Sequence, residues 1–239
     1  MDLTNLAVNR QMPILRKNKM PTGIADLDIL MEGGYRNPAN IILRGPTGPE
    51  KATVSYHFVA TVSPEEHAFI VCSNTSPQDV ISKAATYGLN LSSIHFIDCY
   101  SATLRKDLQD TSTTKIVPGA SALNDLSIAL NEEIKFATGK RLRVVFDTLS
   151  GFVLYNSQDS MRKFLGIICG RLKTANATTL FLLEEGVHDK QVVGVIEQLM
   201  DERFLITDKG TESGGTILTM PDIEIPIPFK LGPSGLTII

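Results

Sequence analysis

Short apolar runs alternate with amphipathic segments along most of this chain, and this alternation limits the folds that it can adopt. The runs have the length and the β-branched or aromatic content of buried strands, and helical spacing of apolar residues follows most of them. Strands that alternate with helices and are apolar on both faces form a mostly parallel sheet covered on each side. The sequence therefore predicts an α/β protein, with strands at residues 40–43, 68–72, 94–97, 142–146 and 179–183.

Local signals place the helices and the connections between these strands. Ser76, Pro77 and Asp79 combine an N-cap, a proline at the first helical position and a capping-box acid, and they predict a helix that stops at Gly88. Thr22 is a candidate N-cap for the first helix. The other predicted helices cover 22–30, 54–62, 124–138, 160–175 and 192–200; residues 101–120 are expected to be a loop, and residues 203–239 are expected to form antiparallel strands and a hairpin.

The size and charge of the chain set broad limits on what it does. Its 239 residues suit one large domain, so we predict a single domain over 22–239 preceded by an N-terminal arm over 1–21. The net charge of -3 argues against non-specific binding to nucleic acid or to an acidic membrane surface. No apolar run reaches the roughly 18 residues that a membrane span needs, and we expect a cytoplasmic protein.

The cysteines and histidines do not form a metal-binding or disulfide pattern. Cys72, Cys99 and Cys169 are odd in number and far apart, with no C-x-x-C spacing, so they are expected to be buried thiols in a reducing compartment. His57 falls in a predicted helix and His95 in a predicted strand, and both are expected to be structural. No metal site is predicted.

The segment from Gly45 to Thr53 carries the strongest chemical signal. A phosphate-binding loop has the form G-x-x-x-x-G-K-[ST] between a strand and a helix, and this segment has that context, with Gly45 and Lys51 at the required spacing. The second glycine is replaced by Glu50, and Ala52 stands where a magnesium-binding hydroxyl is required. The candidate nucleotide-binding residues of this degenerate loop are Gly45, Pro46, Thr47, Gly48, Pro49, Glu50, Lys51, Ala52 and Thr53.

Each departure weakens the loop as a phosphate site, and an ordinary Gly/Pro turn is the alternative interpretation. Such loops direct backbone N–H groups at phosphate oxygens, and Pro49 has no N–H. Glu50 brings a carboxylate to the place where polyphosphate would approach, and like charges about 4 Å apart repel by about 4 kcal/mol at an effective dielectric constant of about 20. Ala52 cannot bind the Mg²⁺ on which phosphoryl transfer depends, and Thr53 comes one residue too late to replace it.

A second acidic motif ends the strand predicted over 142–146. Asp147 follows the apolar run directly, as the Walker B aspartate does in P-loop enzymes, where it helps to hold the metal ion. The alternative is an aspartate that caps the next turn. Asp147 is therefore the Walker B-like candidate.

The order and spacing of these motifs are similar to those of a known family. The chain resembles the RecA-superfamily ATPases of the KaiC type in its Thr-Gly-Ile to Gly-Gly stretch over 22–34, its Ser-Pro-Gln-Asp helix ending in Tyr-Gly-Leu over 76–89, its Asp-Thr-Leu-Ser at 147–150 and its closing hairpin over 228–236. The resemblance covers almost the whole chain from Thr22. It implies a RecA-like P-loop NTPase fold with a C-terminal antiparallel extension, and ATP or ADP as the candidate ligand.

The chain departs from the family pattern where the family performs its chemistry. The family's catalytic acidic pair would align with Asn74 and Thr75, and neither can act as a carboxylate base. The family also has a late basic cluster that reaches the neighbouring subunit's nucleotide, whereas residues 210–229 contain no lysine or arginine. With the altered loop glycine and the missing magnesium hydroxyl, these losses indicate an inactivated ATPase that kept its fold.

The sequence leaves three hypotheses open. The first is a non-hydrolysing regulatory or scaffold protein, for example in signal transduction, which acts on a protein partner or associates with itself. The second is a nucleotide-binding protein with weak or slow ATPase activity. The third is a recombinase-like DNA-binding paralogue, which is disfavoured because the segments 155–159 and 184–189 are not basic.

Two further features near the end of the strand at 179–183 have open roles. Glu184 or Glu185 could replace the missing acidic pair as a carboxylate base, or both could be solvated loop residues. His188 could be a sensor of the bound ligand or a surface histidine.

Overall fold

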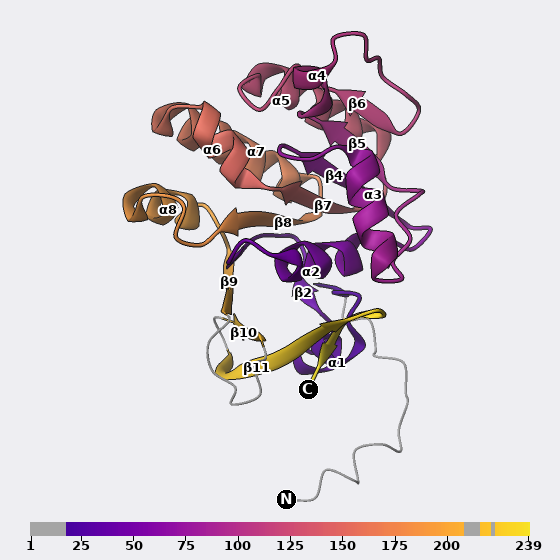
Figure 1. Ribbon diagram of the computed structural model, residues 1–239, viewed down its shortest axis with the longest axis vertical. Coiled ribbons are helices and arrows are strands. Elements are labelled where there is room, and N and C mark those ends of the chain that lie inside the picture. The colour runs from indigo at the N-terminus through magenta and orange to yellow at the C-terminus, as the bar shows by residue number, and fades with distance from the viewer. Residues whose placement is uncertain (1–17, 208–215, 221–222) are drawn as a thin grey trace, which may run out of the picture.

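A parallel sheet with an antiparallel extension organises the molecule (Figure 1). The computed structural model describes residues 18–207, 216–220 and 223–239. Within these residues the main sheet has the strand order β12-β11-β10-β9-β3-β8-β7-β4-β5-β6, and β1 and β2 form a separate antiparallel pair. The strands are β1 (Lys19–Met20), β2 (Tyr35–Arg36), β3 (Ala39–Gly45), β4 (Glu66–Cys72), β5 (His95–Asp98), β6 (Thr114–Ile116), β7 (Arg141–Asp147), β8 (Ala177–Glu184), β9 (Glu202–Thr207), β10 (Thr216–Met220), β11 (Ile223–Gly232) and β12 (Gly235–Ile238).

The pairing of the strands changes from parallel to antiparallel at β9. The seven strands from β9 to β6 pair in parallel, and β9, β10, β11 and β12 pair in antiparallel fashion. Parallel neighbours need crossover connections, and helices supply most of them. The predicted α/β fold, with a mostly parallel sheet and a C-terminal antiparallel extension, is therefore confirmed.

Helices cover both faces of the parallel strands. The described helices are α1 (Ala25–Leu30), α2 (Pro49–Ala60), α3 (Pro77–Thr86), α4 (Ser101–Leu104), α5 (Leu123–Phe136), α6 (Leu149–Tyr155), α7 (Gln158–Thr174) and α8 (Lys190–Glu197). The Ser76 side chain accepts a hydrogen bond from the Asp79 N–H, so the predicted cap of α3 is confirmed. None of the described helices has the length and apolar content that a bilayer crossing requires.

Alternate side chains of each central strand belong to different hydrophobic cores, because successive residues of a strand point to opposite faces. In β3, Ile41 and Leu43 pack in the core beneath α1, α2 and α3, whereas Ile42 packs in the core beneath α5, α6, α7 and α8. In β4, Ile70 lies in the first core and Phe69 in the second. This double burial explains why the strands are nearly continuous apolar runs in the sequence.

A buried ion pair joins the sheet to the segments that cover one of its faces. Arg143 of β7 is 1% exposed, and its Nε donates to Oε2 of Glu66 on β4 at 2.8 Å. Its Nη1 donates to the carbonyl oxygens of Pro21, at 2.7 Å, and Phe58, at 2.8 Å. Arg141 also bonds Glu66. One guanidinium therefore holds two strands, helix α2 and the entry to α1 together.

Four local predictions are wrong. Residues 101–120, expected to be a loop, include α4 and β6. Helix α6 follows Asp147 where no helix was expected, and α2 begins at Pro49, before the predicted start at 54. Thr22 does not cap α1: the N-cap position is Ile24, and the Thr22 hydroxyl accepts a hydrogen bond from the Ile24 N–H, which forms a turn just before the helix.

Parts of other predictions lie outside the described residues. Residues 1–17 of the predicted arm are among them, while Lys19 and Met20 form β1, which pairs with β2. Residues 208–215 and 221–222 of the C-terminal region are also outside the described part. The boundary between the arm and the domain stays a prediction.

Candidate functional site

The candidate site lies at the carboxyl ends of β3, β8 and β7. These strands are neighbours in the order β3-β8-β7, and they end at Gly45, Glu184 and Asp147. Ligands of open α/β sheets bind at this edge. The topology therefore brings the degenerate loop, the Walker B-like aspartate and the acidic end of β8 together.

The degenerate loop is short because α2 begins within it. Gly48 is the N-cap residue of α2 and Pro49 is its first residue, a position where the missing N–H of proline has no cost. Glu50, Lys51 and Ala52 therefore lie in the first turn of α2. An early helix start is typical of a phosphate-binding loop, whose helix N-terminus faces the anion.

Glu50 places its own carboxylate over this helix start. A Cβ atom added to Gly48 would lie 2.5 Å from Oε2 of Glu50, so the side chain folds back over the loop. A negative charge in the first turn of a helix is favoured by the helix dipole. The chain's own anion thus lies where a phosphate-binding loop would receive a phosphate.

Lys51 is buried and bound by groups of the protein. It is 4% exposed, and its ammonium donates to the Pro46 carbonyl oxygen at 3.0 Å. The Nζ atom also lies 3.6 Å from Oε1 of Glu184. A buried ammonium needs such partners, and here the protein supplies them.

The two residues after Lys51 do not offer a metal ligand. Ala52 packs against the hydrophobic core on its side of the sheet. Thr53 is fully buried, and its hydroxyl donates to the Pro49 carbonyl oxygen one turn earlier, at 2.7 Å. The hydroxyl of Thr53 is therefore engaged inside α2 and does not face the site.

Asp147 is a weak acid in this setting. Burial, reinforced by the nearby Glu184 carboxylate, raises the pKa of Asp147 to about 6, although Lys51 and Lys83 partly oppose the shift. A carboxyl group with such a pKa still ionises near neutral pH. Asp147 lies where a Walker B aspartate is expected, at the carboxyl end of β7.

Glu184 is the centre of a hydrogen-bond network. The Thr148 hydroxyl lies 3.0 Å from Oε2 of Glu184 and 2.8 Å from the Leu182 carbonyl oxygen. Burial alone would raise the pKa of Glu184, but the hydrogen bond from Ser150, the Lys51 charge and the Thr148 hydroxyl together lower it. Nε2 of His188 lies 2.7 Å from the Ser150 hydroxyl oxygen, which brings this histidine into the same network.

The structure separates the two adjacent glutamates. The Glu184 side chain points toward Lys51 and Thr148, whereas Glu185 lies 3.2 Å from Nε of Arg44, and its side chain is half exposed. Of the two carboxylates proposed as a substitute base, the structure places only Glu184 in the site.

Comparison of the sequence with known protein families identifies the family of this chain. The sequence pattern of a group described as "Family of unknown function (DUF7504)" matches residues 38–204, which include β3, the loop, Asp147 and Glu184. This chain belongs to that family.

Curated relatives connect the chain to KaiC. It is 27% identical over 176 residues to the circadian clock oscillator protein KaiC of Prochlorococcus marinus (strain MIT 9313), covering 71% of this chain and 34% of that protein. It is also 27% identical over 192 residues to KaiC of Thermostichus vulcanus, covering 76% of this chain and 36% of that protein. The chain thus spans about a third of the length of these relatives.

A solved structure shows the same fold. The KaiC-like protein PH0186 of the hyperthermophilic archaeon Pyrococcus horikoshii OT3 superposes with a TM-score of 0.71, at 18% identity, over 92% of this chain and 98% of that one. Together with the KaiC relatives, this shows that the chain has a KaiC-like, RecA-type fold.

Residues 73–75 follow β4, where the family's acidic pair is expected. The Ser73 hydroxyl donates to the Thr148 carbonyl oxygen at 2.7 Å, so this turn is bonded to the start of α6. A Cβ atom on Gly151 would collide with Asn74 and Ser73, so only glycine allows this close approach. Asn74 is exposed, and the turn brings no carboxylate to the site.

Other residues singled out in the sequence lie elsewhere. His57 accepts a hydrogen bond from the Leu236 N–H at 2.9 Å, which ties α2 to β12 as a structural residue would. The segment 155–159, considered for DNA contact, joins α6 to α7 and is separated from β7 by α6.

Sequence reasoning missed the structural role of Ser73 and the contact between Ser150 and His188. No sequence motif signals the role of Ser73, since its hydroxyl donates to a backbone carbonyl oxygen, which any residue can supply. The second joins residues 38 positions apart in the chain, and only the pairing of the strands brings them together.

Proposed function

We propose that this chain is a KaiC-like protein that does not hydrolyse ATP and that works as a regulatory or scaffold protein, with a second protein or another copy of itself as its partner. The observation that carries the proposal is the internal binding of Lys51, whose ammonium contacts the Pro46 carbonyl oxygen and Glu184. In a working phosphate loop the lysine reaches the β- and γ-phosphates of the nucleotide. Here a nucleotide would have to displace those contacts first.

The charges around Lys51 also oppose a nucleotide. Glu50, Asp147 and Glu184 bring three carboxyl groups to the edge at which β3, β8 and β7 end. One ammonium faces them from within the loop. Since a nucleoside triphosphate is itself highly negative, its approach would add repulsion that a Mg²⁺ ion normally offsets.

The groups needed to activate water are missing or unsuited. A general base works best when its pKa lies near the operating pH. The pKa of Glu184 is lowered by its hydrogen bonds and by Lys51, so this carboxylate is a weak base. Asn74 and Thr75 have no carboxylate, and Ala52 has no hydroxyl for magnesium.

The first test measures phosphate release from ATP and Mg²⁺ with purified wild-type protein. We expect no multiple turnover above the rate of Lys51→Ala, because Asn74 and Thr75 bring no carboxylate base and Ala52 brings no loop hydroxyl for the metal. Multiple turnovers that disappear in Lys51→Ala would refute the loss of hydrolysis. Glu185→Gln is the matched control, since Glu185 pairs with Arg44 outside the site.

A second candidate function is nucleotide binding without efficient hydrolysis. Lys51 is retained in the first turn of α2, after β3, and Asp147 is retained at the carboxyl end of β7, where a nucleotide and its metal would lie. Wild-type protein that is saturated at micromolar ATP in a thermal-shift titration would favour this candidate.

Restoring the loop should restore nucleotide affinity. The double variant Glu50→Gly, Ala52→Ser removes the carboxylate over Gly48 and supplies the missing hydroxyl, so we expect it to bind ATP·Mg²⁺ at least about tenfold more tightly than wild type, a change of about 1.4 kcal/mol. Isothermal titration with and without Mg²⁺ measures this. Equal affinities for the two proteins would show that Glu50 and Ala52 are not what weakens the loop.

A further inference from the structure

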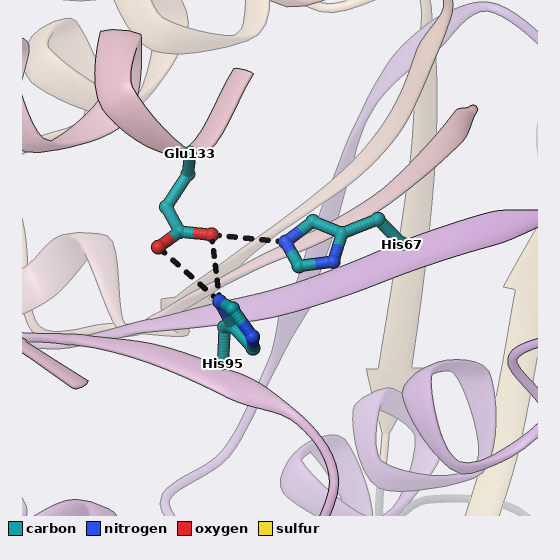
Figure 2. Close-up of side chains that lie close together, drawn as sticks. All are labelled: His67, His95 and Glu133. Carbon is teal, nitrogen blue, oxygen red and sulfur yellow. Dashed lines mark hydrogen bonds and ion pairs between the residues drawn. The ribbon is translucent and has the colours of Figure 1, made fainter. Parts of the chain in front are cut away.

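Two histidines and a glutamate converge at the opposite end of the sheet from the candidate site. His67 is the second residue of β4, His95 is the first residue of β5, and Glu133 lies in the last part of α5. Figure 2 shows both imidazole rings directed at the same carboxylate. Nε2 of His67 lies 2.9 Å from Oε2 of Glu133, and Nδ1 of His95 lies 3.1 Å from the same oxygen.

The fold itself creates this convergence. Phe69 pairs with His95 in the β4–β5 register, so His67, two residues before Phe69, points to the same face as His95. That face is covered by α5, whose buried side contains Leu126, Ala129 and Leu130 as well as Glu133, at helical spacing. The three side chains are therefore placed by backbone pairing and by helix packing.

The carboxylate is buried beside two imidazole rings. Glu133 is 4% exposed, and within the described part of the chain its ion-pair partners are these two histidines, with no lysine or arginine among them. A buried carboxylate is costly unless a cation compensates it. A divalent ion held by all three side chains would compensate it more completely than two hydrogen bonds do.

We propose that His67, His95 and Glu133 bind a divalent transition-metal ion of the zinc class. Imidazole nitrogen and carboxylate oxygen are ligands that Zn²⁺ accepts at about 2.0–2.2 Å, whereas Mg²⁺ and Ca²⁺ prefer oxygen ligands alone. The donor atoms of the three residues all lie within 4.8 Å of one another. Ligands of one tetrahedral zinc ion are about 3.3 Å apart, a value that follows from those bond lengths, and the two nitrogen–oxygen distances of 2.9 and 3.1 Å are close to it.

The surroundings suit an ion held just below the surface. Phe136, in the last turn of α5, packs against both rings, with centroid distances of 5.2 Å to His67 and 5.0 Å to His95. Phe136 is itself 67% exposed, and the His95 side chain keeps 14% of its surface accessible. Three protein ligands leave a fourth position of a tetrahedral ion for water. An ion bound here would join β4, β5 and α5.

The main experiment is a competition titration of tag-free protein with Zn²⁺ and a chromophoric chelator. We expect one zinc per chain with micromolar or tighter affinity, and a loss of at least about tenfold in His95→Gln and in Glu133→Gln. Glu132→Gln is the matched control, because Glu132 is the next residue of α5 and its side chain pairs with Lys115 on the surface. Its zinc affinity should equal that of wild type.

Two further measurements keep the test decisive if a variant folds poorly. At a Zn²⁺ concentration about 100 times the dissociation constant, the melting temperature of wild type should rise by about 5–10 °C. Co²⁺ bound to the wild type should show the intense visible bands of a tetrahedral site, and Glu132→Gln should show the same spectrum.

Several outcomes would overturn the proposal. They are zinc binding only at millimolar concentration, binding unchanged in both ligand variants, or a cobalt spectrum of an octahedral aquo ion. Each would leave His67, His95 and Glu133 as a hydrogen-bonded structural cluster. The site lies at the other end of the sheet from Lys51, so the result does not depend on whether the chain hydrolyses ATP.

Discussion

Replacing Glu66 by leucine is expected to lower the free energy of unfolding by about 3–5 kcal/mol, the cost of leaving a buried charge without its partner. The charge in question is Arg143, which is 1% exposed and donates its Nε–H to Glu66. Its remaining bonds go to backbone carbonyl oxygens, which cannot neutralise it. Urea unfolding of wild type and variant, at neutral pH and equal protein concentration, measures the difference.

Glu65→Leu is the matched control, because the neighbouring Glu65 is exposed. We expect it to change stability by no more than about 0.5 kcal/mol. A loss below about 1 kcal/mol in Glu66→Leu would show that Arg143 finds another counter-charge or water, and that the pair does not hold α2 and the segment before α1 on the sheet.

The ion pair between Glu66 and Arg143 also makes the stability of the fold depend on pH. Burial alone would raise the pKa of Glu66, but its bonds with Arg143, Ser63 and Arg141 lower it below the ordinary value. A carboxyl whose pKa is lowered in the folded state stabilises the fold above its unfolded pKa. That contribution is lost as the pH falls through the folded pKa. We therefore expect the free energy of unfolding of the wild type to decrease in acid as Glu66 becomes protonated.

Replacing Asp147 by asparagine is expected to stabilise the protein above neutral pH by about 1–3 kcal/mol. The pKa of Asp147 is raised to about 6 by burial and by Glu184. The folded state therefore favours the protonated carboxyl. The stability that this protonated group contributes is lost as the pH rises from about 4 through about 6. Asparagine does not ionise. The free energy of unfolding of the variant should therefore exceed that of wild type by an amount that grows as the pH rises through this range.

Urea unfolding at about pH 4.5 and about pH 7.5 tests this expectation. The difference between Asp147→Asn and wild type should be small at the lower pH and large at the higher one. Asp159→Asn serves as the control, since Asp159 is exposed in the first turn of α7, and it should change stability little at either pH. A variant that is less stable than wild type at the higher pH would mean that the ionised Asp147 has a favourable partner.

The outcome also bears on function. If the Asp147 site favours a neutral carboxyl, removing the negative charge beside Lys51 and Glu184 raises the stability of the chain. Binding sites commonly keep residues that lower stability in this way. Binding of a cation at Asp147 would lower its pKa and remove the gain. Repeating the pH series with added Mg²⁺ therefore reports directly on metal binding at this position.

Most of the fold could be read from the sequence because its signals are local. The runs that became β3, β4, β7 and β8 are apolar on both faces, and a doubly covered parallel sheet follows from that pattern alone. The helix after Ser76 was predicted from its cap, and the cap is formed as expected. Such features depend on residues within one turn of each other.

Two of the wrong predictions, those for β6 and α6, involve segments whose conformation depends on distant partners. The short strand β6 within 101–120 has little apolar content, and it forms because its backbone pairs with β5. Helix α6 is held at its start by hydrogen bonds between Thr148 and Ser73. The propensities of a few neighbouring residues contain no information about a hydrogen bond to a residue 75 positions away.

The sequence by itself determined the α/β class and the KaiC-like motifs, including the replacement of a loop glycine by Glu50 and of a hydroxyl by Ala52, since each is a property of residue type and spacing. Only the tertiary structure decided that Glu184 and not Glu185 faces Lys51, and that His67, His95 and Glu133 meet. The physical reason is that strand order, register and helix packing set distances between side chains far apart in the chain, and no local pattern encodes those distances.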